Sequence, residues 1–180
     1  MGVTLYTLGH SNRRLADCLD ILRAAGVRVL VDIRSRPASR RQPQFNGPLL
    51  RAACEQEGLV YHWAGRQLGG RRPARPGSPH RGLPEGLRGF ADYMDGPAFQ
   101  RAAAQLRRLA SDAPTALLCA ERDPGACHRG LIADYLLLEA VEVRHLIDTG
   151  LSIPHRLHPA ARRESARLVY DAAPVAGPGG

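Results

Sequence analysis

The stretch LLCAERDPGACHRGLIADYLL concentrates reactive side chains between an apolar, strand-like segment and a helix-like one. Unpaired N–H groups and the helix dipole at such a junction attract anions, and they also lower the pKa of a nearby thiol. Cys119 is therefore a candidate nucleophile, whereas Cys127 could equally be a core residue of the helix. Glu121 and His128 are candidates for proton transfer, and Arg129 is a candidate for holding an anionic substrate group.

The same cysteines could bind a metal. Together, Cys119, Cys127, His128 and His10 could supply four ligands, but the sequence has no C-x-x-C or H-x-x-x-H spacing. The sequence therefore predicts no cofactor, and a metal bound by Cys119, Cys127 and His128 is kept as an alternative.

Segments with strand and helix patterns alternate along the chain. This predicts an α/β fold: a single three-layer domain over residues 1–170, with a mainly parallel sheet of about five strands flanked by helices. Strands are expected at 3–8, 27–33, 59–63, 115–119 and 141–147. Helices are expected between Ser11 and Gly26, and at 48–57, 85–94, 97–110, about 123–139 and 159–170. Residues 64–84 are expected to form a surface loop, and residues 171–180 a flexible C-terminal tail.

Polar residues follow the ends of the predicted strands. In an open parallel sheet, ligands bind beyond the carboxyl ends of the strands. The residues that this rule brings together are His10 and Asp32 for catalysis, and Ser11, Arg34, Ser35, Gly69, Gly70 and Arg71 for substrate binding. Asp32 and Arg34 could alternatively form a structural ion pair that orients the site. We expect one pocket at this edge of the sheet, with Cys119 in its wall.

The composition favours anionic partners. The net charge is +8, and all 25 basic residues are arginine, whose planar guanidinium suits two-point recognition of phosphate or carboxylate. A compositional bias of the genome could equally account for the arginines. The absence of lysine excludes Schiff-base catalysis and a Walker A phosphate loop.

The remaining features are less specific. No apolar run reaches the roughly 18 residues that span a bilayer, and the N-terminus has no signal-peptide pattern, so we expect a cytoplasmic protein without a membrane partner. Cys18 and Cys54 lie on apolar helix faces and are interpreted as core residues. Five histidines are interpreted as structural or exposed: His62, His80, His145, His155 and His158.

Several short motifs agree in order and spacing with a known family. They are Gly9-His10-Ser11, Asp32-Ile33-Arg34-Ser35, Pro43-Gln44-Phe45-Asn46, Leu68-Gly69-Gly70, Cys119-Ala120-Glu121 and Cys127-His128-Arg129, between Thr4 and Ile147. By these motifs the chain resembles the bacterial domain of unknown function 488 family. The resemblance implies a compact α/β domain of bacterial or archaeal type, adds Phe45 and Asn46 to the candidate substrate-binding residues, and implies no particular reaction. The layout of the Asp-x-Arg and cysteine strand ends is similar, more weakly, to rhodanese-like domains, although the loop from Cys119 to Arg129 is longer here.

Three functions follow as hypotheses. The first is an enzyme, a hydrolase or transferase, that acts on an anionic, phosphate-bearing substrate such as a nucleotide or nucleic acid, with Arg34 and Arg129 holding the anion. The second is a non-catalytic nucleic-acid-binding module that uses the arginines of residues 34–41 and 71–81. The third is a metal-dependent enzyme with Cys and His ligands. The expected partner is thus an anionic small molecule or a nucleic acid.

Overall fold

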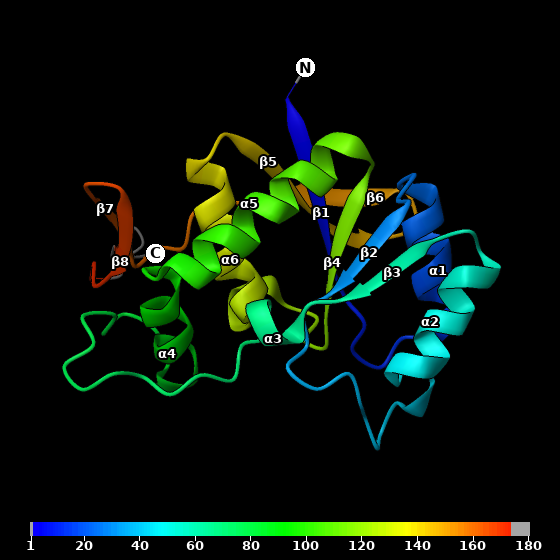
Figure 1. The fold of residues 1–180 in the computed structure, drawn as a ribbon, viewed down its shortest axis with the longest axis horizontal. Helices are drawn as coiled ribbons and strands as arrows, with labels where there is room; N and C mark the ends of the chain where they lie inside the picture. Colours follow the sequence, from blue (N-terminus) through cyan, green and yellow to red (C-terminus); the bar gives the residue numbers. More distant parts are fainter. Residues whose placement is uncertain (1, 174–180) are drawn as a thin grey trace, which may run out of the picture.

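Strands and helices alternate along the chain from β1 to β5 in the computed structural model, which describes residues 2–173 (Figure 1). The strands are β1 (Val3–Gly9), β2 (Val29–Asp32), β3 (Val60–Trp63), β4 (Thr115–Cys119), β5 (Val141–Asp148), β6 (Leu151–Pro154), β7 (Ala161–Glu164) and β8 (Arg167–Tyr170). The α-helices are α1 (Leu15–Ala24), α2 (Gly47–Gln56), α3 (Gly65–Leu68), α4 (Glu85–Met94), α5 (Pro97–Asp112) and α6 (His128–Leu138). Two short 3₁₀-helices are η1 (Pro43–Phe45) and η2 (Pro124–Ala126).

Six strands form one sheet in the order β3-β2-β4-β1-β5-β6. The first five strands pair in parallel, and β6 runs antiparallel to β5. The predicted α/β fold with a mainly parallel sheet is therefore confirmed. The sheet has one strand more than expected because the chain turns back after β5, where Gly150 adopts a left-handed φ of 73° that glycine tolerates without steric cost.

Buried strand residues alternate between two cores, one on each face of the sheet. Val29 and Val31 belong to one core and Leu30 to the other, because successive side chains of a strand point to opposite faces. Helices α1 and α2 contribute to one core, and α4, α5 and α6 contribute to the other (Figure 1). Cys18 and Cys54 lie in the core beneath α1 and α2, as expected. The sheet is thus the middle of three layers.

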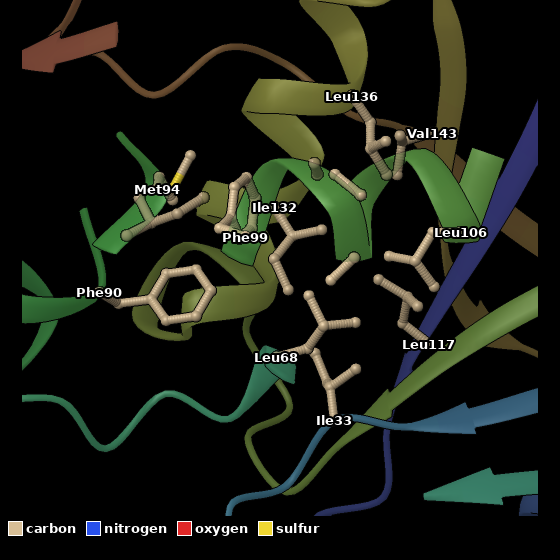
Figure 2. Close-up of a cluster of buried hydrophobic side chains, with 14 of the residues drawn as sticks. Ile33, Leu68, Phe90, Met94, Phe99, Leu106, Leu117, Ile132, Leu136 and Val143 are labelled. Carbon is tan, nitrogen blue, oxygen red and sulfur yellow. The ribbon is translucent and has the colours of Figure 1, made fainter. Parts of the chain in front are cut away.

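The larger core lies between the sheet and helices α4 to α6. Figure 2 shows Phe90, Phe99 and Ile132 in one continuous cluster with Leu117 of β4. The rings of Phe90 and Phe99 meet edge to face with centroids 5.8 Å apart, which is a favourable aromatic geometry. Phe90 also contacts the ring of His128, with centroids 5.1 Å apart. The core therefore reaches the first residue of α6 and fixes its position.

The segment at 159–170, which was expected to be helical, is a β-hairpin. Strands β7 and β8 pair antiparallel from Ala161↔Tyr170 to Glu164↔Arg167, and Ser165 in the turn has a φ of 55°. The helix prediction was wrong because alanine, arginine and glutamate favour a helix locally, whereas three successive residues of β8 are buried. Tertiary packing of an extended strand thus outweighs local propensity here.

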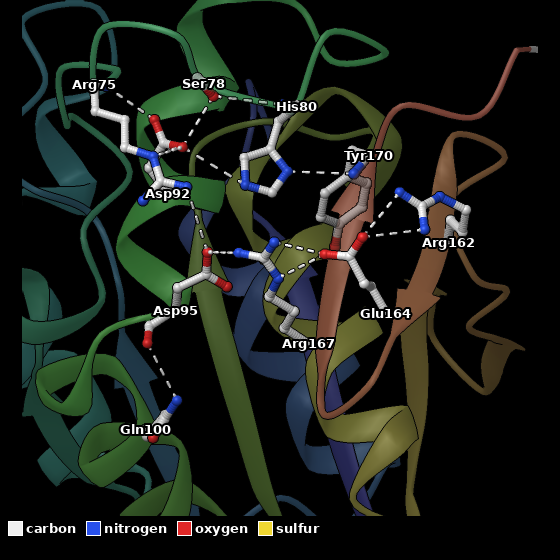
Figure 3. Close-up of polar contacts among 10 residues, drawn as sticks. All are labelled: Arg75, Ser78, His80, Asp92, Asp95, Gln100, Arg162, Glu164, Arg167 and Tyr170. Atoms are coloured by element: carbon white, nitrogen blue, oxygen red, sulfur yellow. Dashed lines mark hydrogen bonds and ion pairs between the residues drawn. The ribbon is translucent and has the colours of Figure 1, made fainter.

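Polar contacts attach this hairpin to the rest of the protein. Figure 3 shows Arg167 between Glu164 of the hairpin and Asp95 after α4, with ion pairs of 2.5 and 3.4 Å. The backbone N–H of Tyr170 donates to Nδ1 of His80 at 3.2 Å. Because His80 belongs to the long connection between α3 and α4, the hairpin holds that connection in place.

The surface loop expected at 64–84 is irregular only after the short helix α3. The tail expected at 171–180 lies outside the described residues from position 174 onward. No helix within residues 2–173 combines the length and apolar character that a membrane crossing requires.

Candidate active site

The carboxyl ends of three neighbouring strands meet at the centre of the sheet. Cys119 ends β4, and the pairing register places it beside Gly9 at the end of β1. On the other side of β4, Leu118 pairs with Asp32 at the end of β2. A pocket of about 320 Å³ opens at this edge, lined by the segments that leave these strands. Its position agrees with the rule for ligand sites in open parallel sheets.

The floor of the pocket is a cluster of two thiols and an imidazole. The Sγ atoms of Cys119 and Cys127 lie 3.0 Å apart, and the Cys127 thiol is the donor. Nδ1 of His128 lies 3.6 Å from the Cys127 sulfur and 4.0 Å from the Cys119 sulfur. The hydrogen bond from Cys127 is the main cause that lowers the pKa of Cys119, and His128 adds to this effect while burial opposes it. The hydrogen bond to Cys119, together with burial, raises the pKa of Cys127, so Cys119 is the cysteine of the pair that more readily forms a thiolate.

The turn between β4 and α6 brings Cys127 to this cluster. Asp123 accepts a hydrogen bond from the N–H of Gly125 at 2.8 Å and starts η2. Cys127 is extended, with φ −134° and ψ 147°, and its sulfur accepts the N–H of Arg129 as the N-cap of α6. The predicted helix from Asp123 is therefore divided in two, and the α-helix begins directly at the pocket.

The ring of His128 is oriented by its neighbours. Nε2 lies 3.2 Å from the carbonyl oxygen of Ile33, so Nε2 carries a proton and Nδ1 faces the two sulfurs. Gly70 lies against the ring, and a Cβ at this position would come within 2.5 Å of Nδ1. A glycine is thus required at position 70 by the close approach of the imidazole.

A buried ion pair forms one wall of the pocket. Asp32 accepts hydrogen bonds from Nε and NH2 of Arg34 at 2.9 and 2.6 Å. Arg34 also donates to the carbonyl oxygen of Phe45 at 2.7 Å and to Nε2 of His10 at 3.3 Å. These contacts satisfy all but one of the guanidinium N–H donors. Within residues 2–173, one N–H of Arg34 thus has no protein partner and can donate to a ligand in the pocket.

His10 is held as a neutral imidazole beside this ion pair. Nδ1 donates to the carbonyl oxygen of Ser11 at 3.0 Å, which leaves Nε2 to accept from Arg34. Burial is the main cause that lowers the pKa of His10, and the charge of Arg34 acts in the same direction. The ring stacks on Phe45 with centroids 4.2 Å apart. Both nitrogens of His10 are thus engaged in the structure.

Two arginines line the mouth of the pocket without protein partners. Among residues 2–173, the guanidinium groups of Arg36 and Arg71 make neither a hydrogen bond nor an ion pair. The backbone N–H of Arg71 donates to Oγ of Ser35 at 3.1 Å, which ties its segment to the end of β2. The exposed Glu121 lies on the same rim. The mouth therefore carries two positive charges that are available to an anion.

A family model described as Domain of unknown function DUF488 matches residues 14–136, which is more than half of the chain. The chain belongs to the DUF488 family. The DUF488 match includes the Asp32–Arg34 pair and the cluster of Cys119, Cys127 and His128. It is shorter than the range from Thr4 to Ile147 expected from the motifs, so His10 and the C-terminal hairpin lie outside it. No curated protein and no solved structure gives a significant match to the chain.

Most of the predicted site residues of this DUF488 domain surround the pocket. Those that line it are His10, Arg34, Ser35, Gly70, Arg71, Cys119, Glu121 and His128, together with Cys127. Those that support it from behind are Ser11, Asp32, Phe45, Asn46 and Gly69. Asn46, for example, accepts the backbone N–H of Ser39 at 2.7 Å and holds the segment that carries Arg36.

Arg129 points away from the pocket. Its buried guanidinium donates to Oγ1 of Thr7 at 3.1 Å, to the carbonyl oxygen of Glu121, and to that of Arg122 at 2.8 Å. Gly9 lies beneath the same turn, where a Cβ would overlap the Glu121 carbonyl. The structure therefore places Arg129 as a brace for the turn after β4, and its donors do not face a ligand.

A buried polar chain that the sequence did not predict continues from Arg129. Thr7 Oγ1 lies 2.7 Å from Nδ1 of His145, and Nε2 of His145 lies 2.9 Å from Nδ1 of His155. Nε2 of His155 donates to Oδ1 of Asp134 at 2.7 Å. The alternation of β5 could have indicated that His145 is buried, but His155 follows β6 in an irregular segment and gives no such signal.

The arginine-rich connection between α3 and α4 uses two of its arginines internally. The guanidinium of Arg72 lies 3.4 Å from the ring centroid of Tyr93, a cation–π contact. Arg75 pairs with Asp92 at 3.3 Å. These charges are therefore less available to nucleic acid than the sequence alone indicates.

One cluster of donors could hold a metal ion. Among residues 2–173, Cys119, Cys127 and His128 form the one group whose three ligand atoms lie within 4.8 Å of one another. Thiolate and imidazole are donors that zinc prefers. The contact between Nε2 of His128 and the Ile33 carbonyl is the kind of outer hydrogen bond that orients metal-bound histidines.

Proposed function

We propose that this protein is an enzyme, a hydrolase or transferase, in which the Cys119 thiolate attacks an anionic, phosphate-bearing substrate. One observation carries this proposal. The Cys119 sulfur accepts a hydrogen bond from Cys127 at the floor of a pocket whose mouth holds two arginines, Arg36 and Arg71, without partners among the described residues. The thiolate is the nucleophilic form of cysteine, and a nearby hydrogen-bond donor favours it.

The substrate's anionic group would bind at the mouth. Arg36 and Arg71 can donate charge-assisted hydrogen bonds to phosphate oxygens, and the remaining N–H of Arg34 can donate from deeper in the pocket. The pocket volume of about 320 Å³ lies at the lower end of the range for small-molecule sites. A small phosphorylated molecule such as a nucleotide is therefore favoured over a nucleic-acid duplex.

The other site residues would assist the thiolate. Cys119 forms a bond to the electrophilic atom of the substrate and displaces a leaving group. Glu121 lies on the rim, where its carboxyl group can transfer a proton to that leaving group or from an attacking water. Nδ1 of His128 would take up a thiol proton, and the resulting positive charge would favour the thiolate, whereas His10 and Asp32 hold Arg34 in place.

If the site had a rhodanese-like layout, Arg129 would bind the anionic group of the substrate. Because all three contacts of that guanidinium are made to Thr7 and to backbone carbonyls, our proposal assigns the anion to Arg36 and Arg71 instead. The similarity to rhodanese-like domains then concerns only the strand-end cysteine and the Asp-x-Arg segment.

Ligand screening tests the proposal. Phosphorylated metabolites and nucleotides are screened by thermal shift, since a ligand at one hundred times its dissociation constant stabilises by about 2.7 kcal/mol. Compounds that bind are then tested for turnover by the wild type and by the Cys119→Ser and Cys54→Ser variants. We expect Cys119→Ser to keep binding and lose turnover, and Cys54→Ser to keep both. Full turnover by Cys119→Ser would remove Cys119 from the nucleophile role.

A metal-dependent enzyme is the second candidate, because the donors of Cys119, Cys127 and His128 lie within 4.8 Å. The three residues would hold a zinc-like ion with one position open to the pocket, where the ion could activate water. Elemental analysis of protein purified without a histidine tag separates the candidates. About one equivalent of zinc in the wild type, absent from Cys127→Ser, would favour the metal enzyme over the free thiolate.

A further inference from the structure

We propose that Cys119 and Cys127 form a reversible thiol–disulfide couple that is oxidised by hydroperoxides. This activity goes beyond the proposed reaction, and it does not depend on a phosphate-bearing substrate. It rests on the distance between the two sulfurs, on their position in the lining of the pocket and on the exposed residues directly before Cys127.

The two sulfurs are already close to bonding distance. Their separation is 3.0 Å, and a disulfide needs about 2.05 Å, so an approach of about 1 Å closes the bond. The two cysteines lie eight positions apart on different elements, with Cys119 fixed at the end of β4 and Cys127 at the N-cap of α6. Arg129 holds the carbonyls of Glu121 and Arg122, whereas Gly125 and Ala126, directly before Cys127, are exposed, so a small displacement would fall on the Cys127 side of the turn.

The pocket gives a small oxidant access to the pair. Cys119 and Cys127 both line it, although only 6% and 3% of their surfaces are exposed. The pocket therefore gives a small hydroperoxide a route to the two sulfurs. Cys18 and Cys54 are not among the lining residues, and they lie in the core beneath α1 and α2.

The hydrogen bond assigns a role to each sulfur. Cys127 donates its S–H to Cys119, and this hydrogen bond stabilises negative charge on the Cys119 sulfur, so we assign the attack to Cys119 and the second step to Cys127. The Cys119 thiolate attacks one oxygen of a hydroperoxide, the O–O bond breaks, and the alkoxide or hydroxide leaves and takes a proton from solvent. Cys119 is thereby oxidised to a sulfenic acid, and the peroxide is reduced to an alcohol or water.

The second step uses the neighbouring thiol. The Cys127 sulfur attacks the sulfenic sulfur, the S–O bond breaks, and the departing hydroxide takes the Cys127 proton to form water. The product is a Cys119–Cys127 disulfide, which an external dithiol can reduce again. Because the disulfide removes the thiolate from the pocket floor, oxidation would also switch off the proposed enzyme.

Peptide mapping tests the couple directly. Reduced full-length protein is treated with one equivalent of hydrogen peroxide at neutral pH, the remaining thiols are blocked with N-ethylmaleimide, and the protein is digested with trypsin. Cleavage after Arg108, Arg122 and Arg129 releases peptides 109–122 and 123–129, each of which holds one cysteine of the pair. We expect these peptides to be joined, Cys18 and Cys54 to be blocked, and dithiothreitol to reverse the link.

Single variants separate the two steps. In Cys127→Ser, a sulfenic acid at Cys119 should accumulate and be trapped by dimedone, whereas Cys119→Ser should consume peroxide at least about tenfold more slowly than the wild type. Cys54→Ser is the matched control and should form the link as the wild type does, at least about tenfold faster than Cys18 is oxidised. A disulfide that involves Cys18 or Cys54, or equal slow oxidation of all four thiols, would overturn the proposal. Protection of both pocket thiols that only a chelator removes would overturn it as well, because they would then be metal ligands.

Discussion

The carboxylate of Asp32 and the guanidinium of Arg34 form a two-point ion pair beneath the pocket, with side-chain exposures of 0% and 6%. Tyr61 adds its hydroxyl to the same carboxylate at 2.6 Å, so the charge of Asp32 is compensated on several sides. The ion pair positions the guanidinium of Arg34 in the pocket wall, and Arg34 in turn donates a hydrogen bond to Nε2 of His10. The stability of the site and its shape therefore depend on the same contact.

Removing the carboxylate charge should destabilise the whole protein. In Asp32→Asn the buried guanidinium loses its counter-ion, and we expect the free energy of unfolding to fall by about 3–5 kcal/mol. Urea denaturation followed by circular dichroism measures this change. Asp20→Asn is the matched control, because Asp20 pairs with Arg23 on the surface and should contribute about 0–1 kcal/mol. Equal effects of the two variants would contradict a buried ion pair.

Gly70→Ala should disturb the thiol cluster more than the fold. A Cβ at position 70 would come within 2.5 Å of Nδ1 of His128, so the ring has to move away from the two sulfurs. We expect Cys119 to be alkylated about tenfold more slowly near neutral pH, with a loss of stability of about 1–3 kcal/mol. Gly86→Ala is the control, because no atom lies within 4 Å of a Cβ there and alanine favours the helix α4. Unchanged reactivity of Cys119 in Gly70→Ala would show that His128 does not support the thiolate.

The sheet could be predicted from the sequence because its signals are local. The apolar run before Asp32 marks a strand, and the glycines that follow helices mark the helix ends. Both signals can be recognised without reference to the rest of the chain. The C-terminal hairpin could not be predicted in this way. Its β8 strand is stabilised by contacts with distant residues, such as the bond from the Tyr170 hydroxyl to Asp134 at 2.9 Å.

The sequence predicted the location of the candidate site more accurately than the roles of its residues. The rule for strand ends brings Cys119, His10 and Arg34 to one pocket, because it depends only on strand order. The direction of a long side chain does not follow from its position in the sequence. Arg129 stands at the start of α6 but turns to Thr7, whereas the paired role of Cys127 depends on the extended backbone at its N-cap.

Neutralising the arginines at the mouth should weaken binding of phosphate-bearing ligands. Arg36→Gln and Arg71→Gln each remove one charge-assisted hydrogen-bond donor, and we expect each to raise the dissociation constant about tenfold, equivalent to about 1.4 kcal/mol. Isothermal titration calorimetry with a ligand found by screening measures the change. Arg40→Gln is the control, because Arg40 is exposed but outside the pocket lining. A loss of binding in all three variants would indicate a diffuse electrostatic surface, as in a nucleic-acid-binding module.

The alkylation rate of Cys119 should depend little on pH. The hydrogen bond from Cys127 lowers the pKa of Cys119, so its thiolate should persist from about pH 6 to pH 8 and react with iodoacetamide at a nearly constant rate. Burial raises the pKa of Cys18 to about 12 and that of Cys54 to about 11, so their rates should stay low and rise about tenfold per pH unit. Mass spectrometry of timed samples gives the rate at each cysteine. A tenfold rise per pH unit at Cys119 would show that it is an ordinary thiol.

His145 should make the protein less stable in acid. Burial lowers the pKa of His145 from 6.5 to about 4, and the neighbouring His155 and Arg129 act in the same direction. Since the unfolded chain binds a proton at a higher pH than the folded chain, this contribution is fully present above pH 6.5. It is lost as the pH falls from 6.5 towards 4, by about 3 kcal/mol in all.

His145→Gln tests this dependence, because glutamine can hydrogen-bond with Thr7 and His155 but does not titrate. The free energy of unfolding is measured by urea denaturation from pH 4.5 to pH 7.5. We expect the wild type to lose more stability than the variant as the pH falls, by about 2–3 kcal/mol over this range. His62→Gln is the control, because His62 is exposed on β3 and its removal should leave the curve parallel to that of the wild type. Parallel curves for His145→Gln would mean that His145 is protonated in the folded protein, and Nδ1 of His145 would then donate to Oγ1 of Thr7 instead of accepting from it.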